Sequence, residues 1–417
     1  MRKYVASSRI SGRVRAPASK SVMLRAVAAA VLSEGRAVTI SNPSLCDDAE
    51  TALGIAEGLG AAVRRETGAV VITAGVHPAA RILHCGESGL CLRMFPAVAA
   101  LDDAEFVFEA RGSLRTRPAG MLEAPLRALG AACVTRQGFA PVTVRGPLRG
   151  GRAEVEAGLS SQALTGLLLA LPRAPGDSEL SVPAIKSRAY AEMTLDFLRR
   201  AGIRTSGEVP GVLRIEGRQS YRAASYAIEG DWSGAAFLLV AGALAGEITV
   251  LGLDPESLQA DRAVCEALEK CGADVAAGPA GVSSRRRDLR GFAMDLSGAP
   301  DLFPPLVALA CACEGTTRLE GAGRLRHKES DRALTLRSEF GRLGADIRIE
   351  ADSLVVRGGP LHGGTASSHG DHRVAMALAV AALRAGAEVA IEDAGCVGKS
   401  YPEFFEDLAA VGGRIHE

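Results

Sequence analysis

Basic residues recur beside serine and glycine at several points where a helix is expected to begin. In the first of these segments, Ser19-Lys20-Ser21 precedes an apolar helical stretch, and Arg25 follows about one helical turn later. Backbone N–H groups at the start of a helix, with a lysine and an arginine on the same face, can surround an anion. A serine before a helix also serves as an ordinary N-cap. Taken alone, the segment is compatible with either role.

Three further segments share this character. Residues 85–94 contain two glycines ahead of an arginine that opens a helix, and glycine lets a ligand approach the backbone closely. Residues 112–118 form a basic turn, which is also typical of solvated surface. Ser160, Ser161 and Gln162 open a very apolar helix. Helix capping explains one of these three polar residues but not all of them together.

Carboxylates appear in the second half of the chain. Asp301 precedes the apolar run 306–313, where it could act as an N-cap. Residues 324–332 are densely charged, as a solvated loop with internal ion pairs would be. Residues 369–373 precede an alanine-rich helix. No His or Cys lies at a suitable helical spacing from His372, which indicates a structural or hydrogen-bonding histidine and not a metal ligand.

Composition limits the possible partners and compartments. The 417 residues include 48 Lys and Arg and 48 Asp and Glu, so the formal net charge is zero, and we expect no global attraction to nucleic acid or membrane. We find neither a signal-peptide pattern nor an apolar run of the roughly 20 residues that a membrane span requires. The nine cysteines are dispersed without metal spacing, which favours reduced thiols in a cytoplasm.

A repeat of about seventy residues organises the chain. A helix-like run ending in a small-residue stop occurs six times, and the glycines of these stops are separated by 70, 72, 70, 72 and 68 residues. Glycine is well suited to the left-handed residue that ends a helix. After most stops the pattern is strand, turn and strand, most clearly in residues 345–357. The length fits two domains of about 200 residues each. We therefore predict six small α+β modules, three to a domain. The six stops are Gly60, Gly130, Gly202, Gly272, Gly344 and Gly412.

In this order the motifs resemble the EPSP synthase family, whose members are 3-phosphoshikimate 1-carboxyvinyltransferases. The resemblance extends through nearly the whole chain, and its most specific elements are Lys328-Glu329-Ser330-Asp331-Arg332 and Asp371-His372-Arg373. The other elements are Ser19-Lys20-Ser21 with Arg25, residues 86–93, Arg117-Pro118, Ser160-Ser161-Gln162, Ser187 with Tyr190, Glu229-Gly230-Asp231, Pro300-Asp301 and Lys399.

The resemblance implies an α/β (α+β) fold of two inside-out, barrel-like domains, each with three βαβαββ repeats. It implies that the chain crosses between the domains twice, so we place residues 1–14 and 230–417 in one domain and 15–229 in the other. The first would form the phosphoenolpyruvate side with the catalytic carboxylates, and the second the shikimate 3-phosphate side. The resemblance also implies a monomer.

The resemblance implies two sets of substrate-binding residues. Both substrates are densely anionic, and arginine and lysine are their natural receptors. The residues expected at shikimate 3-phosphate are Lys20, Ser21, Arg25, Ser160, Ser161, Gln162, Ser187, Tyr190, Asp301 and Lys328. Those expected at phosphoenolpyruvate are Lys20, Gly89, Arg117, Gln162, Arg332, Arg373 and Lys399.

The implied reaction is addition followed by elimination in a cleft that closes to exclude water. The shikimate 5-hydroxyl attacks C2 of phosphoenolpyruvate while the methylene carbon gains a proton, and the tetrahedral intermediate then loses phosphate. Asp301 is the expected base and Glu329 the expected acid, since two carboxylates can take opposite roles in different environments. Lys20 and Lys399 would stabilise the departing phosphate. No metal, nucleotide or flavin is required.

Some positions depart from the family pattern. Glu87 stands where Asn is common and would add negative charge near the phosphoenolpyruvate pocket, which leaves sensitivity to glyphosate-like inhibitors open. Leu90 replaces a usual Thr, Ala189 a usual Pro, and Trp232 follows Asp231 where a small residue is common.

Two alternatives remain from the sequence alone. The first is the sister carboxyvinyltransferase that acts on UDP-N-acetylglucosamine. The short, cysteine-free turn before Arg117 and the Lys20-Ser21 pair argue against it. The second is a non-catalytic scaffold that keeps an anion-binding cleft. Retention of both Asp301 and Glu329 argues against that.

Overall fold

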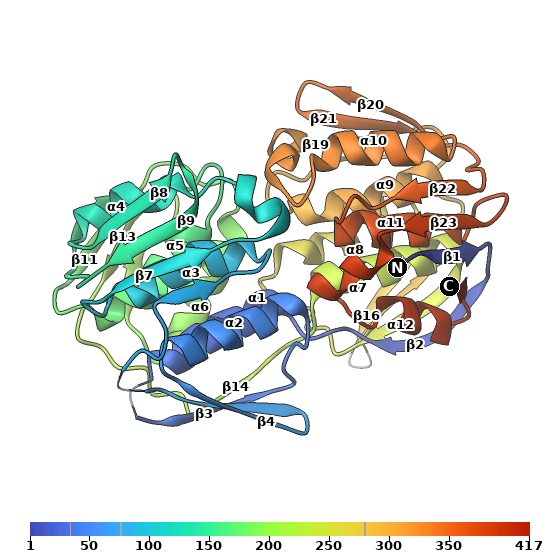
Figure 1. The fold of residues 1–417 in the computed structure, drawn as a ribbon. Coiled ribbons are helices and arrows are strands. Elements are labelled where there is room, and N and C mark those ends of the chain that lie inside the picture. The colour runs from blue at the N-terminus through green and yellow to red at the C-terminus, as the bar shows by residue number, and fades with distance from the viewer. Residues whose placement is uncertain (34, 76, 279–280) are drawn as a thin grey trace. The chain divides into compact units, whose positions relative to one another are not determined.

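The computed structural model describes residues 1–33, 35–75, 77–278 and 281–417. The chain divides into two compact units (Figure 1). The terminal unit consists of Met1–Pro17 and Glu229–Glu417, and the central unit of Ala18–Ile228. The predicted domain boundaries, after residue 14 and before residue 230, each lie within three residues of the boundaries in the structure.

Six four-stranded sheets, three in each unit, form the scaffold of the described residues. The sheet β6-β7-β9-β8 shows the pattern: β6 and β7 are parallel, and β9 is antiparallel to both β7 and β8. Its module reads βαβαββ along the chain, which confirms the predicted fold class. The elements are β6 (Ile82–His84), α3 (Gly89–Ala99), β7 (Glu105–Glu109), α4 (Glu123–Ala128), β8 (Ala132–Arg136) and β9 (Phe139–Arg145).

Two more modules complete the central unit. One consists of β10 (Gly151–Glu154), α5 (Gln162–Ala170), β11 (Ser178–Val182), α6 (Arg188–Arg200), β12 (Thr205–Gly207) and β13 (Gly211–Ile215). The other takes its first strand, β14, from the far end of the unit, where it pairs in parallel with β3. It consists of β14 (Ser225–Ala227), α1 (Lys20–Val31), β3 (Ala37–Ser41), α2 (Asp47–Gly58), β4 (Ala62–Glu66) and β5 (Ala69–Thr73).

The terminal unit repeats the pattern three times, and the first 17 residues supply strands to two of its sheets. Strand β2 pairs in parallel with β15, and β1 lies between β23 and β24 (Figure 1). The first module has β2 (Ile10–Arg15), α7 (Trp232–Ala245), β15 (Gly246–Leu251), α8 (Val264–Lys270), β16 (Asp274–Gly278) and β17 (Gly281–Arg285). The second has β18 (Ala293–Asp295), α9 (Phe303–Cys311), β19 (Thr316–Glu320), α10 (Arg332–Arg342), β20 (Asp346–Glu350) and β21 (Ser353–Arg357). The third has β22 (Gly364–Ser367), α11 (His372–Ala382), β23 (Val389–Glu392), α12 (Phe404–Ala410), β24 (Arg414–His416) and β1 (Lys3–Ala6).

The six predicted glycine stops all end helices. Each glycine lies two residues beyond the last residue of α2, α4, α6, α8, α10 or α12, and each has a positive φ, between 80° and 109°. A side chain would strain the backbone in this region, so glycine is the favoured residue. The predicted hairpin after Gly344 is β20 and β21, paired in antiparallel register.

The helices fall into two classes that follow their hydrophobic patterns. Helices α1, α3 and α5 contact one another inside the central unit, and α7, α9 and α11 do so inside the terminal unit. Helix α7 is apolar on all sides and every residue except Ser233 is buried. Helix α10, by contrast, buries one face only, as an amphipathic helix on the outside of a module should.

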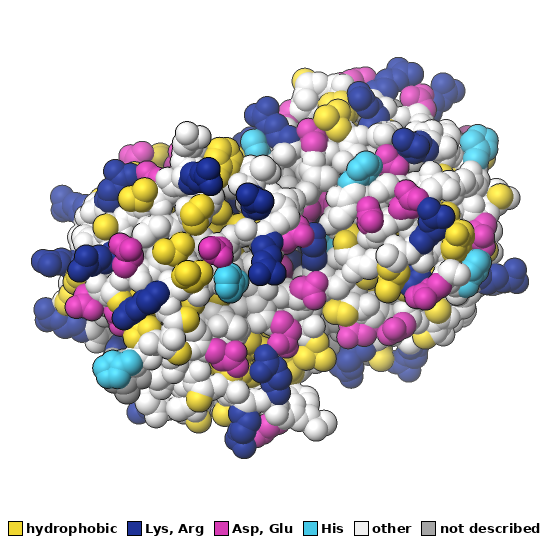
Figure 2. Space-filling model, viewed as in Figure 1, with side chains coloured by type: hydrophobic (Ala, Val, Ile, Leu, Met, Phe, Trp, Pro, Cys, Tyr) yellow, Lys and Arg dark blue, Asp and Glu magenta, His cyan; other side chains and the backbone are white. Residues whose placement is uncertain are grey.

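The surface reflects the charge balance of the chain. In the view of Figure 2, basic and acidic side chains are interspersed over the visible face. Among the described helices none has the length and apolarity that crossing a bilayer would require.

Candidate active site

The predicted site motifs stand near the N-terminal ends of helices. Six of them precede the buried helices α1, α3, α5, α7, α9 and α11, and the others precede or begin the outer helices α4, α6, α10 and α12. Four of the buried helices have a serine or aspartate N-cap whose side chain accepts a hydrogen bond from the first turn: Ser19 for α1, Ser88 for α3, Asp231 for α7 and Asp371 for α11. Helix α5 begins after Ser160 and Ser161, and Asp301 lies in the short 3₁₀ helix Pro300–Leu302 before α9. Unpaired N–H groups and the helix dipole make such ends favourable for anions.

Lys20, the first residue of α1, is held by a carboxylate that the sequence analysis missed. Its Nζ lies 2.9 Å from Oδ2 of Asp48, in the first turn of α2. The acidic pair Asp47-Asp48 was visible as the start of a helix, where acidic residues are common. Only the contact between α1 and α2 reveals that Asp48 orients the lysine.

Arg25 is buried among neutral acceptors. It donates to the Ser21 carbonyl at 2.7 Å, the Thr194 hydroxyl at 2.9 Å and the Tyr190 carbonyl at 3.2 Å. Within the part of the chain that the structure describes, no carboxylate pairs with it. Burial lowers the pKa of Arg25 to about 10, so it stays charged at neutral pH. Such a cation gains from an anionic ligand, since no carboxylate among the described residues neutralises it.

Arg93 and Arg117 meet at the start of α3. Arg93 Nη1 donates to Gln162 Oε1 at 2.6 Å, and its Nε donates to the Pro118 carbonyl at 2.9 Å. A Cβ on Gly89 would lie 2.9 Å from Arg117 Nη2, so glycine is needed for this approach. The start of α3 thus brings together three residues of the predicted phosphoenolpyruvate set: Gly89, Arg117 and Gln162. Arg93 belonged to a recognised motif but had no predicted role.

Glu87 faces the turn that leads to Arg117. Its Oε2 accepts hydrogen bonds from the Ser113 amide at 3.3 Å and the Ser113 hydroxyl at 3.0 Å. A Cβ on Gly112 would come within 2.4 Å of the Glu87 carboxylate. The expected negative charge is therefore engaged with the 3₁₀ turn Gly112–Thr116 that precedes Arg117.

The remaining predicted residues of the central unit lie at the starts of α5 and α6. The Ser160 hydroxyl accepts from the Gln162 amide at 3.3 Å, and Ser161 is buried. Ser187 is buried directly before α6. Tyr190, in the first turn of α6, offers its carbonyl to Arg25.

Asp301 is surrounded by three cations of the terminal unit. Its Oδ1 lies 3.1 Å from Lys328 Nζ and 2.9 Å from Arg332 Nη1, and its Oδ2 lies 3.2 Å from Arg373 Nη2. Burial alone would raise the pKa of Asp301, but Arg373, Lys328 and Arg332 hold it well below the usual range.

Arg332 is the centre of this cluster and is fully buried. It binds Asp371 through Nε at 2.9 Å and Nη2 at 3.2 Å, and Nη2 also donates to Glu329 Oε2 at 2.6 Å. Burial opposes its charge, but Asp371, Glu329 and Asp301 raise the pKa of Arg332 above its ordinary value. Asp371 in turn caps α11 by accepting from the Arg373 amide at 3.0 Å.

Lys399 ends the 3₁₀ helix Ala394–Lys399 and donates to the Gly370 carbonyl at 2.9 Å. This places its ammonium group next to the Asp371-His372-Arg373 motif. The charged side chains that gather around the start of α9 and α11 are therefore Asp301, Lys328, Glu329, Arg332, Arg373 and Lys399.

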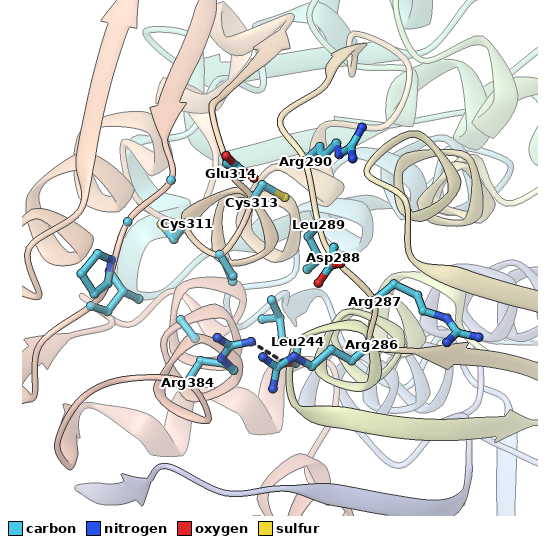
Figure 3. Close-up of a pocket in the computed structure, with 17 residues that line it drawn as sticks. Leu244, Arg286, Arg287, Asp288, Leu289, Arg290, Cys311, Cys313, Glu314 and Arg384 are labelled. Carbon is cyan, nitrogen blue, oxygen red and sulfur yellow. Dashed lines mark hydrogen bonds between the residues drawn. The ribbon is translucent and has the colours of Figure 1, made fainter.

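A cavity of about 570 Å³ lies at the C-terminal ends of α7, α9 and α11, away from the predicted motifs (Figure 3). Its lining includes Arg286, Arg287, Arg290 and Arg384, and Figure 3 shows Arg286 and Arg384 next to Leu244. Arg384 donates to the Leu244 carbonyl at 3.3 Å. Arg384 thus contacts the negative end of the α7 dipole, whereas Arg287 pairs with Asp274 at 2.8 Å.

Comparison with known proteins agrees with this arrangement. The family model described as EPSP synthase (3-phosphoshikimate 1-carboxyvinyltransferase) matches residues 5–408. A 3-phosphoshikimate 1-carboxyvinyltransferase from Methanothrix thermoacetophila is 41% identical over 424 residues, covering 99% of this chain and 98% of the relative. Another, from Methanocorpusculum labreanum, is 37% identical over 423 residues and all of both chains. The solved structure of EPSP synthase from Acinetobacter baumannii has a TM-score of 0.84, with 26% identity and full coverage of both chains.

The fold and these matches define a carboxyvinyltransferase of the two-unit, six-module type, and the chain belongs to the EPSP synthase family. The resemblance inferred from the motifs is confirmed. The activity is that of EC 2.5.1.19: the enolpyruvyl group of phosphoenolpyruvate is transferred to shikimate 3-phosphate, in the shikimate pathway to aromatic amino acids.

Proposed function

We propose that the side chains gathered in each unit bind the substrates of this transfer and carry its proton transfers. The observation that carries the proposal is that six of the motifs stand at the N-terminal ends of the six buried helices, where anions are favoured, and that residues of the other motifs contact them. The central unit forms the shikimate 3-phosphate side, and the terminal unit supplies the catalytic carboxylates.

Shikimate 3-phosphate is assigned to a set centred on Arg25. The buried guanidinium has neutral partners only among the described residues, so the phosphate can take its full attraction. The hydroxyls of Ser160, Ser161 and Ser187 suit the remaining phosphate oxygens. The full proposed set is Lys20, Ser21, Arg25, Ser160, Ser161, Gln162, Ser187, Tyr190, Asp301 and Lys328.

Phosphoenolpyruvate is assigned to lysine and arginine side chains with one glycine and one amide. Arg332 and Arg373 already bind carboxylates, and the substrate offers them a further carboxylate and a phosphate. The full proposed set is Lys20, Gly89, Arg117, Gln162, Arg332, Arg373 and Lys399.

The chemistry assigns opposite roles to two carboxylates. Asp301 accepts the proton of the 5-hydroxyl as the oxygen bonds to C2, and Glu329 delivers a proton to the methylene carbon. In the elimination, Glu329 takes back a proton from the methyl carbon and phosphate leaves, with Lys20 and Lys399 balancing its charge. Asp301 then loses the hydroxyl proton to solvent. In the free protein three cations make Asp301 a weak base. When Arg332 and Arg373 turn part of their charge to the substrate, Asp301 becomes more basic at the moment it is needed.

The test is phosphate release by the purified protein with phosphoenolpyruvate and shikimate 3-phosphate. UDP-N-acetylglucosamine serves as the competing acceptor. Release with shikimate 3-phosphate alone is the expected result. The variants Asp301→Asn and Glu329→Gln should bind both substrates and lose turnover. If Glu329→Gln turned over normally, its role as the acid would be wrong.

We also infer that the chain is a cytoplasmic monomer. All nine cysteines are free thiols, which suits a reducing compartment. Light scattering of the purified chain at micromolar concentration tests the oligomeric state, and a mass of twice 43.1 kDa would contradict it.

A further inference from the structure

The short segment 367–371 links β22 to α11 and contacts the stretch that carries Lys399 at two points. The Gly370 carbonyl accepts a hydrogen bond from Lys399 Nζ at 2.9 Å. The Ser368 hydroxyl donates to the Asp393 carbonyl at 3.1 Å, directly before the 3₁₀ helix that ends at Lys399. The position of the Lys399 ammonium group therefore depends on the conformation of this segment.

The middle of the segment is a left-handed turn. His369 and Gly370 have φ values of 51° and 70°. Glycine adopts this conformation readily, but it is uncommon for a residue with a side chain. Two hydrogen bonds within the segment support the turn, from the His369 amide to the Ser367 hydroxyl at 3.1 Å and from the Gly370 amide to the Ser368 hydroxyl at 3.2 Å. A group that binds the His369 side chain would favour this turn over other conformations.

Glu339, on α10, binds the segment from a buried position, with its side chain 3% exposed. Its Oε2 accepts a hydrogen bond from the Ser367 amide at 2.9 Å, and its Oε1 lies 3.0 Å from His369 Nε2. An ionised carboxylate only accepts, so the histidine carries the proton of this bond on Nε2. The Ser338 hydroxyl also donates to Oε1, at 3.1 Å. Hydrogen bonds to a buried carboxylate are strong because little water competes for them.

Glu339 and Arg332 hold the two ends of the segment from one face of α10. Glu339 follows Arg332 by seven residues, about two helical turns, so both side chains lie on the same face. Arg332 binds Asp371, the last residue of the segment, at 2.9 Å, and Glu339 binds the first. Helix α10 contacts both β22 and α11 (Figure 1). The turn that offers the Gly370 carbonyl is thus confined from both sides.

We propose that Glu339 is a positioning residue of the transfer reaction that acts through Lys399. It fixes the turn within segment 367–371, whose Gly370 carbonyl holds the Lys399 ammonium group. A lysine has a flexible four-carbon stem, so its charge stays in one place only when fixed acceptors hold it. Misplacing that charge weakens the stabilisation of the departing phosphate. This inference rests on the proposed role of Lys399 at phosphoenolpyruvate.

The test measures kcat/KM for phosphoenolpyruvate by phosphate release. Glu339→Ala removes both bonds to the segment and should lower kcat/KM roughly 10- to 100-fold, the cost of misplacing a reacting group by about 1 Å. Glu339→Gln can accept from the Ser367 amide and donate to the other tautomer of His369, so it should stay within about threefold of the wild type. The KM for shikimate 3-phosphate should not change, because Lys399 is outside the set assigned to that substrate.

Arg342→Gln is the matched control. The exposed Arg342 lies 3.5 Å from Oε2 of the same carboxylate. An exposed ion pair of this kind contributes little, so the variant should have the kcat/KM of the wild type.

A double-mutant cycle tests whether the effect passes through Lys399. In a Lys399→Ala background, Glu339→Ala should lower kcat/KM by less than about twofold, because the group that it positions is already absent. His369→Asn tolerates the left-handed turn but lacks the ring nitrogen that binds Glu339. It should show the same pattern with a smaller loss, roughly two- to tenfold, and it replaces Glu339→Ala if that variant does not fold.

A kcat/KM equal to that of the wild type in Glu339→Ala would overturn the proposal. So would equal losses with and without Lys399, or a Glu339→Gln variant as impaired as Glu339→Ala. A parallel rise in KM for shikimate 3-phosphate would overturn it as well, because that is the sign of a merely structural loss. Failure of the proposed role of Lys399 has a different signature, in which Lys399→Ala alone leaves kcat/KM for phosphoenolpyruvate unchanged.

Discussion

Arg25 of the central unit and Arg332 of the terminal unit are both buried, but their surroundings differ. Arg25 donates to hydroxyl and carbonyl oxygens, while Arg332 binds three carboxylates, Asp371, Glu329 and Asp301. A buried cation with neutral partners keeps its attraction for an anionic ligand. A cation inside a carboxylate network is already compensated, and its ligand must compete with the protein's own acids. The cluster around Arg25 (the central cluster) is therefore suited to binding. The cluster around Arg332, with Asp301, Glu329 and Asp371 (the terminal cluster), is suited to proton transfer.

The largest expected effect concerns the acids of the terminal cluster. Asp301→Asn should reduce kcat by roughly 10²–10⁴, the usual contribution of a general base. Single-turnover experiments with both substrates measure it, and Asp288→Asn, at an exposed carboxylate of the cavity in Figure 3, is the control. A loss confined to KM would mean that Asp301 only binds substrate, which would remove the proposed contrast with Arg25.

The two arginines themselves should differ in stability. Arg332→Met leaves three carboxylates without their partner and should lower the free energy of unfolding by about 3–5 kcal/mol. Arg25→Met leaves only neutral acceptors and should cost about 1–3 kcal/mol, with a large rise in KM for shikimate 3-phosphate. Urea denaturation of both variants measures the difference. Equal losses would show that the neutral partners of Arg25 matter as much as the carboxylates of Arg332.

Asp261, a buried carboxylate in the 3₁₀ helix Ala260–Ala263 of the terminal unit, should contribute to the pH dependence of stability. Because the pKa of Asp261 is about 6 in the folded chain and near 3.8 in the unfolded chain, the folded state binds this proton more tightly. Its contribution is complete below about pH 4 and is lost as the pH rises to about 6, an effect on the order of 2–3 kcal/mol. Denaturation of Asp261→Asn should lack this loss. A parallel pH profile for the wild type and the variant would contradict it.

The smallest effect is expected at Glu87. Glu87→Ala removes two hydrogen bonds to Ser113 and loosens the turn before Arg117, so KM for phosphoenolpyruvate should rise by roughly two- to fivefold. The value of kcat should not change. Glu87→Gln, which keeps an acceptor, should behave nearly like the wild type. If Glu87→Ala lowered the KM for phosphoenolpyruvate, the negative charge of Glu87 would matter more than its two hydrogen bonds to Ser113.

Local features made much of the fold predictable. The glycine stops, the hairpin after Gly344 and the all-apolar pattern of α7 each arise from neighbouring residues, and each appears as expected. The motif order also led directly to the family. Asp48 and Asp261 were not found, because each resembles an ordinary acid near the start of a helix. Their partners Lys20 and Ser233 lie 28 residues away in both cases.

The sequence by itself determined the six modules, their helix ends and the family, because these depend on backbone conformation and on short motifs. Only the tertiary structure decided which carboxylate faces which cation. Side chains from different modules meet in the interior of a unit, where low polarizability makes each contact strong and where spacing along the chain carries no information about distance. Arg25 and Arg332 look alike in the sequence, and the difference between them lies in the helices that surround each one.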